Sequence, residues 1–117
     1  MIDEVHRVAL IEELLQMARP ISEVARALSN LEWDYEGEGV TLAKHHLTSV
    51  LERFLLGELD ASEVERWANL VEGRDDVDIS TAGRHALDAL HELANPLLTQ
   101  ALSVERARTL VSLLTTS

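Results

Sequence analysis

The sequence predicts an all-α protein, a single compact bundle of five to six helices, and three observations lead to this fold class. Apolar residues recur at helical spacing along most of the chain. No stretch shows the alternating apolar and polar residues that are typical of a half-buried strand. The 117 residues, 46% hydrophobic and 26% charged, are enough for one domain with its own core. We therefore expect residues 1–117 to form a single helical domain.

The N-terminal part predicts two helices and a loop. Residues 2–18 carry a broad apolar face, and Pro20 then interrupts this helix. A shorter helix is expected over about 21–31, where apolar residues again repeat at helical spacing. Residues 32–40, with the sequence EWDYEGEGV, contain two glycines and no periodicity, which predicts a loop.

The third predicted helix spans 42–56 and has a start and a stop signal. Thr41 is the expected N-cap, and Gly57 can take the left-handed conformation that ends many helices. His45 and His46 lie about 100° apart on this helix, so they cannot converge on one metal ion. We interpret both histidines as structural.

The fourth predicted helix spans about 62–72. Ser62 and Glu65 have the spacing of a capping box, and Gly73 is expected to end the helix. Trp67 falls on the apolar stripe, so its expected role is core packing.

Two more helices complete the expected fold. Residues 74–80 link to a helix over about 81–94, which Asn95-Pro96 stops because proline disfavours the helical conformation for its predecessor. Ser103 is then placed to open the last helix, whose apolar stripe should complete the core.

The formal charge of −11 is concentrated in two stretches. Residues 30–40 carry −4 and residues 57–79 carry −6, so the remainder of the chain carries only −1. An acidic surface repels phosphate backbones and anionic lipid, so we expect neither direct nucleic-acid binding nor membrane binding. No apolar run approaches the roughly 20 residues needed to span a bilayer, and the N-terminus lacks the pattern of a signal peptide, so a cytoplasmic location is expected.

No pattern of catalytic or cofactor-binding residues is found. The chain has no cysteine, which excludes disulfides and thiolate chemistry, and it lacks phosphate-binding glycine loops and nucleophile elbows. The stretch EGRDDVDI at 72–79 fails the spacing of a calcium loop, because position twelve counted from Asp76 is Leu87. We therefore predict no catalytic residues, no metal site, no cofactor and no enzymatic activity.

The two acidic stretches are the candidate partner-binding surface. Aromatic anchors beside acids suit contact with a basic protein, because the rings supply desolvated binding energy and the acids steer association. Two alternatives stay open: the rings cap the core while the acids solvate it, and Asp75 braces the turn toward the next helix. The candidate partner-binding residues are Trp33, Asp34, Tyr35, Glu36, Glu38, Asp75, Asp76 and Asp78.

Residues 50–114 resemble a group of small bacterial proteins. The segments that carry the resemblance are Glu65-x-Trp67-Ala68-Asn69, the run Glu72 to Asp76 followed by Val77, and Glu92-Leu93-Ala94-Asn95-Pro96. In size, acidity, helical content and the entry of the helix from Gly57 to Trp67, the chain also resembles immunity proteins of bacterial toxin systems, such as contact-dependent growth inhibition and colicin D type nuclease toxins.

The immunity resemblance implies a function without chemistry. Such a protein would bind and occlude a basic nuclease toxin, with Trp33 and Tyr35 as anchors and the acids as partners for toxin lysines and arginines. A regulatory or adaptor domain with another protein partner is the alternative, and an enzyme with an acidic metal site comes third. The oligomeric state stays open.

Overall fold

The computed structural model describes residues 4–29, 39–74 and 77–116, and six helices and two short strands occur in these ranges. The prediction of an all-α bundle is confirmed. In chain order the elements are α1 (Glu4–Gln16), α2 (Ile21–Leu28), β1 (Val40–Thr41), α3 (Lys44–Leu55), α4 (Ala61–Glu72), β2 (Val77–Asp78), α5 (Arg84–Ala94) and α6 (Val104–Thr116).

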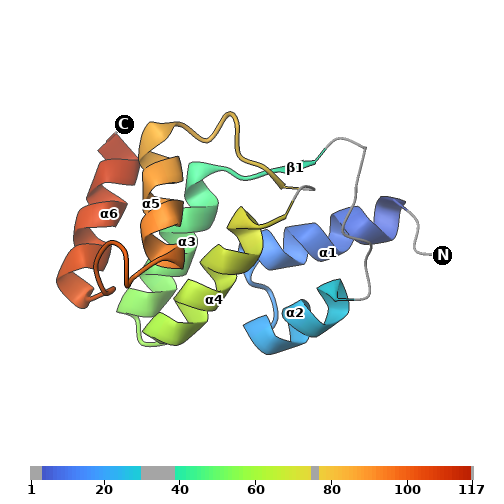
Figure 1. The fold of residues 1–117 in the computed structure, drawn as a ribbon, viewed down its shortest axis with the longest axis horizontal. Coiled ribbons are helices and arrows are strands. Elements are labelled where there is room, and N and C mark those ends of the chain that lie inside the picture. Colours follow the sequence, from blue (N-terminus) through green and yellow to red (C-terminus); the bar gives the residue numbers. More distant parts are fainter. Residues whose placement is uncertain (1–3, 30–38, 75–76, 117) are drawn as a thin grey trace.

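The helices pack as neighbouring pairs along an axis of 44 Å (Figure 1). Helix α3 packs mainly on α6, and α4 mainly on α5. Helices α1 and α2 pack on each other at one end of the long axis, while α6 lies at the opposite end. Helix α3 contacts both α1 and α6, and α4 contacts α1, α2 and α5, so these two helices connect the ends of the molecule.

The core is built from the predicted apolar faces, with Trp67 at its centre. The side chain of Trp67 is fully buried, as predicted, and its indole N–H donates a hydrogen bond of 2.6 Å to the Leu14 carbonyl. That carbonyl lies in the last turn of α1, where it also accepts a 3.0 Å hydrogen bond from the Met17 N–H just beyond the helix. Trp67 therefore fixes the end of α1 against α4 across 53 residues of sequence.

Helix α3 begins two residues later than predicted, and the prediction of Thr41 as its N-cap is wrong. Thr41 belongs to strand β1, and the N-cap position is Ala43, which has no side chain able to cap. His46, at the third position of the helix, makes the reciprocal contact of a capping box, because its Nδ1 accepts a 2.9 Å hydrogen bond from the Ala43 N–H. Partial burial, and then the neighbouring His45, lower the pKa of His46, which favours the neutral ring that this acceptor role requires.

The capping box of α4 also lies two residues from its predicted position. Asp60 is the N-cap: its Oδ1 accepts from the Glu63 N–H at 2.8 Å, and Glu63 Oε1 accepts from the Asp60 N–H at 3.1 Å. Ser62 and Glu65 therefore lie inside the helix. Both pairs have the same spacing, and the extended backbone of Asp60 decides between them.

The predicted helix ends at Gly57, Gly73 and Asn95 are confirmed. Gly57 has φ +81°, and the Glu58 N–H donates to the Arg53 carbonyl at 2.9 Å, which is the pattern expected after a left-handed terminator. Helix α1 ends in the same way at Met17, with φ +46°, although methionine rarely adopts this conformation. The Ser103 cap of α6 is also confirmed, because its Oγ accepts from the Arg106 N–H at 3.1 Å.

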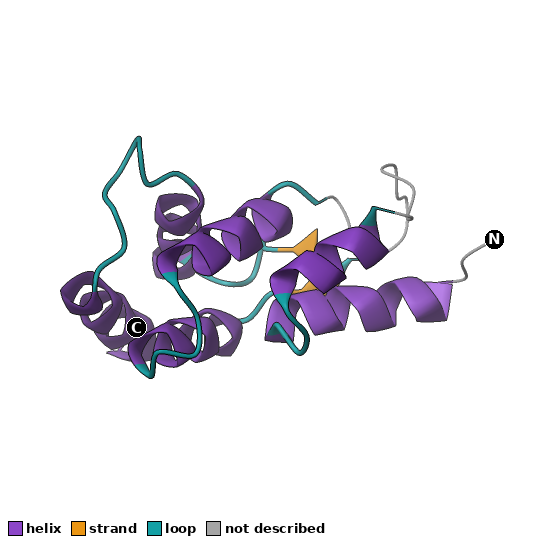
Figure 2. Ribbon diagram, turned by 90° about the horizontal axis from the view of Figure 1, so that it is seen from below, coloured by secondary structure: helices purple, strands orange, loops and turns teal. Residues whose placement is uncertain are grey.

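The sequence did not predict the two strands. β1 and β2 pair in parallel, with Val40 opposite Val77 and Thr41 opposite Asp78, and the pair lies beside α1 (Figure 2). A two-residue strand is too short to show a period, which explains why the alternation test missed it. The pairing matters because it brings together the two acidic stretches: Val40 ends residues 30–40, and β2 lies within residues 57–79.

Candidate functional site

The strand pair holds together two segments that are far apart in the sequence. Besides the two residue pairs of the ladder, the Leu42 N–H donates a 2.9 Å hydrogen bond to the Asp78 carbonyl. Val77 is buried, whereas Thr41 is exposed and Asp78 is partly exposed. In a parallel ladder both chains run in the same direction, so Val40 and Val77, the first residues of the two strands, lie at the same end of the pair. The chain that follows residues 30–38 and the chain that follows residues 75–76 are therefore neighbours.

Asp78 is the one predicted binding residue that falls within the described residues. The other candidates, which lie outside them, are Trp33, Asp34, Tyr35, Glu36, Glu38, Asp75 and Asp76. The roles given to these seven residues therefore stay predictions.

The Asp78 carboxylate takes part in a local turn at the end of β2. Its Oδ1 accepts hydrogen bonds from the Ser80 hydroxyl at 2.6 Å and from the Ser80 N–H at 2.9 Å. The hydroxyl first, and then the N–H, hold the pKa of Asp78 below its ordinary value because both donate to the charged form. Asp78 thus has a structural role in the turn and keeps its negative charge near the ladder.

Replacing Ser80 by alanine should move the pKa of Asp78 upward. The change removes the larger of the two stabilising donors and leaves the backbone N–H in place. The stabilisation that this pair gives is present above the unfolded-state pKa of Asp78, and it is lost as the pH falls through the lower folded-state pKa. In Ser80→Ala the folded-state pKa of Asp78 should lie closer to its unfolded-state pKa. The variant should therefore lose less stability between neutral and acid pH than the unchanged protein. An NMR titration of the Asp78 carboxyl carbon measures the shift. Ser62→Ala, an exposed serine on α4, is the matched control and should leave the titration unchanged.

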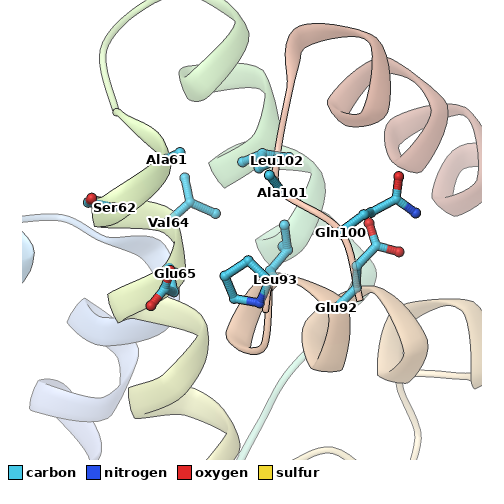
Figure 3. Close-up of a pocket in the computed structure, with 10 residues that line it drawn as sticks. Ala61, Ser62, Val64, Glu65, Glu92, Leu93, Gln100, Ala101 and Leu102 are labelled. Carbon is cyan, nitrogen blue, oxygen red and sulfur yellow. The ribbon is translucent and has the colours of Figure 1, made fainter. Parts of the chain in front are cut away.

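A pocket between α4, α5 and the segment that follows α5 was not predicted. It has a volume of about 240 Å³. In Figure 3, Val64 from α4 and Leu93 from α5 point toward one another, and Leu102 lies at one end of the pocket. The complete lining is Ala61, Ser62, Val64, Glu65, Glu92, Leu93, Pro96, Gln100, Ala101 and Leu102.

Exposed leucines lie beside this pocket. A second, more open hollow is lined by Glu65, Ala94, Asn95, Pro96, Leu97 and Leu98, so the two hollows share Glu65 and Pro96. The side chain of Leu97 is 100% exposed and that of Leu98 is 79% exposed. A sequence signal existed: two leucines directly follow the helix-stopping Asn95-Pro96, where no helical stripe can bury them.

An ion pair between α5 and α6 borders the pocket. Arg106 donates from Nε to Glu92 Oε2 at 2.7 Å and from its terminal Nη2 to Glu92 Oε1 at 2.6 Å. This two-point geometry is the strong form of an arginine–carboxylate pair. Both side chains are largely buried, so Glu92 is committed to holding the helices together.

The described residues contain neither a cluster of metal ligands nor a helix that could span a membrane. Across residues 4–29, 39–74 and 77–116, no cluster of three or more histidine, aspartate or glutamate side chains is arranged to hold a metal ion. Within the same residues, every helix is too short or too polar to cross a membrane.

The fold and the site together define a small acidic helical protein in which a parallel strand pair joins the end of residues 30–40 to β2, within residues 57–79. Comparison of the chain with protein-family models, with curated proteins and with solved structures gives no match.

Proposed function

We propose that this chain is a cytoplasmic, non-enzymatic immunity protein that binds a cognate basic nuclease toxin and occludes its active site. The parallel pairing of β1 with β2 is the observation that carries the proposal. It holds the chain after residues 30–38 beside the chain after residues 75–76, which supports the two acidic stretches acting as one surface. The resemblance to toxin-immunity proteins supplies the class of partner.

The charge pattern fits a protein that competes with a nucleic acid. A nuclease cleft is basic because it binds phosphates, and carboxylates placed over it can occupy the same positions. The two stretches hold nearly all of the net charge of −11. Asp78, an acid of the second stretch, is ionised at neutral pH, and the Ser80 hydroxyl and N–H hold its pKa below the ordinary value. Trp33 and Tyr35 are the proposed anchors, and the proposed charged contacts are Asp34, Glu36, Glu38, Asp75, Asp76 and Asp78.

A protection assay tests the proposal. The gene next to the one for this chain in its native host is expressed alone and together with this chain. We expect growth arrest and nucleic-acid cleavage by the neighbouring product alone, and protection when both are present. A neighbouring product that is harmless and binds tightly to the chain would favour the alternative, a regulatory or adaptor domain. A toxic product that the chain neither binds nor inhibits would contradict the proposal.

A further inference from the structure

We propose a second binding surface, formed by the two hollows on either side of Glu65, that docks a basic segment of a protein partner with apolar residues flanking its charge. This surface goes beyond the proposed function, because it contains none of the proposed partner-binding residues, although Glu65 lies within the acidic stretch 57–79. It includes Ala61 and Glu65 in the first turns of α4, whereas the strand pair follows the other end of that helix. From Glu65 to the end of α4 at Glu72 the helix rises by about 10 Å.

The surface has apolar places on both sides of one carboxylate. Val64, Leu93 and Leu102 line the first hollow, and Leu97 and Leu98 stand exposed at the second, which is larger and more open. Soluble proteins rarely leave large neighbouring apolar side chains fully in water unless the patch binds something. The first hollow, of about 240 Å³, lies below the roughly 300 to 1,000 Å³ typical of small-molecule sites, so it suits a single side chain of a partner. The second hollow is larger, about 480 Å³, but more open to solvent.

Glu65 is the available charge at this surface. It lines both hollows and is exposed, and among the described residues its carboxylate makes no hydrogen bond or ion pair. The other carboxylate at the pocket, Glu92, is already held by both nitrogens of Arg106. A lysine or arginine of the partner would therefore pair with Glu65, while the apolar residues on either side of that lysine or arginine enter the two hollows.

Charge complementarity selects this occupant over the others. Residues 57–66 carry Glu58, Asp60, Glu63 and Glu65 against Arg66. Glu58 pairs with Arg53, and Asp60 and Glu63 form the capping box, so Glu65 is the acid whose carboxylate can meet a partner cation. A second copy of the chain would bring a net charge of −11 against the same charge, and anionic lipid or nucleic acid would also be repelled. A lysine or arginine flanked by apolar residues is attracted by the acids and buries its neighbours against the leucines.

Peptide binding to the full-length chain, followed by NMR, tests this surface. The probe is a short capped peptide with one arginine between two leucines. Two matched peptides carry glutamate in place of the arginine, or serines in place of the leucines. We expect the first peptide alone to shift the amide signals of Glu65, Leu93 and Leu102 at millimolar concentration. Shifts centred on other elements, equal responses to the three peptides, or no response to the first would overturn the proposal.

Variants then separate the contributions of charge and apolar contact. Glu65→Gln, and the double change Leu97→Ser with Leu98→Ser, should each weaken peptide binding by about threefold or more, the effect expected of an exposed ion pair or a small apolar contact. All three residues are exposed, so the fold should survive. Glu12→Gln on α1 and Leu113→Ser on α6 are the controls and should leave the affinity unchanged. Unchanged affinity in Glu65→Gln would contradict the basic occupant. Self-association that Leu97→Ser abolishes would assign the surface to a second copy instead.

These outcomes are independent of the proposed function. The peptides need no toxin, so docking at Glu65 can succeed when the protection assay fails. Conversely, the peptide can fail to bind while the chain still protects against the toxin. If Glu65→Gln also protects, this surface is rejected and the proposed function stands.

Discussion

Replacing Trp67 by alanine is expected to lower the free energy of unfolding by about 3 to 5 kcal/mol, the cost of removing a large aromatic side chain from a packed core. The side chain is fully buried, and its N–H donates to the Leu14 carbonyl at the end of α1. Total stabilities of small domains are about 5 to 15 kcal/mol, so this change should remove a large part of the margin. We expect the urea midpoint to fall by about 2 M.

Phenylalanine at the same position separates packing from hydrogen bonding. Trp67→Phe keeps most of the ring contacts and loses the indole N–H, while the Leu14 carbonyl still accepts from the Met17 N–H at 3.0 Å. The expected loss is therefore smaller, about 1 to 2 kcal/mol. Far-ultraviolet circular dichroism is the suitable readout because these variants change tryptophan fluorescence directly. Leu97→Ala, at a fully exposed side chain, should change stability by less than about 0.5 kcal/mol. Equal losses for Trp67→Ala and Leu97→Ala would refute the assigned core.

Reversing the charge of Asp75, Asp76 and Asp78 to lysine should slow association with the basic partner by about tenfold or more. Long-range attraction between an acidic surface and a basic cleft raises association rates by about 10- to 1,000-fold, and three reversals change the net charge by six units. Stopped-flow or surface-based kinetics at low salt measures the association rate. Circular dichroism checks that the variant remains folded.

A triple reversal elsewhere gives the matched control. Glu12, Glu23 and Glu105 are exposed acids on α1, α2 and α6, and changing them to lysine alters the net charge by the same amount. The association rate should respond much less, because the change lies away from the acidic stretches. An equal slowing in both triple variants would mean that only net charge matters. Loss of folding in the first variant would assign these aspartates to the structure of the turn.

The fold could be predicted from the sequence because apolar residues repeat at helical spacing and local residues mark where helices stop. The stripe around Trp67, the left-handed glycine at position 57 and the Ser103 cap were all predicted from a few neighbouring residues. The predicted starts of α3 and α4 were wrong for the same reason. Thr41 and Ser62 are residue types that often cap helices, but tertiary contacts place the N-caps at other residues. Thr41 pairs with Asp78 in the ladder, and Asp60 has the extended backbone that a capping residue needs.

The site was less accessible because its geometry depends on contacts that are distant in sequence. Nothing local to Val40 or Val77 shows that they pair across 37 positions. The pocket beside Glu65 likewise needs α4, α5 and the segment before α6 to meet. Sequence patterns identified where the acids lie, but pairing between distant residues decides which of them share a surface.

The dissociation constant of the complex with the basic partner, measured over a range of salt concentrations, tests the central claim most directly. If the paired acidic stretches provide the binding surface, the dissociation constant should rise by about tenfold or more between 50 mM and 500 mM sodium chloride, because salt shortens the range of charge attraction. The triple reversal at Asp75, Asp76 and Asp78 should flatten this dependence, and the control reversal should not. An affinity that is the same at both salt concentrations would contradict the electrostatic account of this protein.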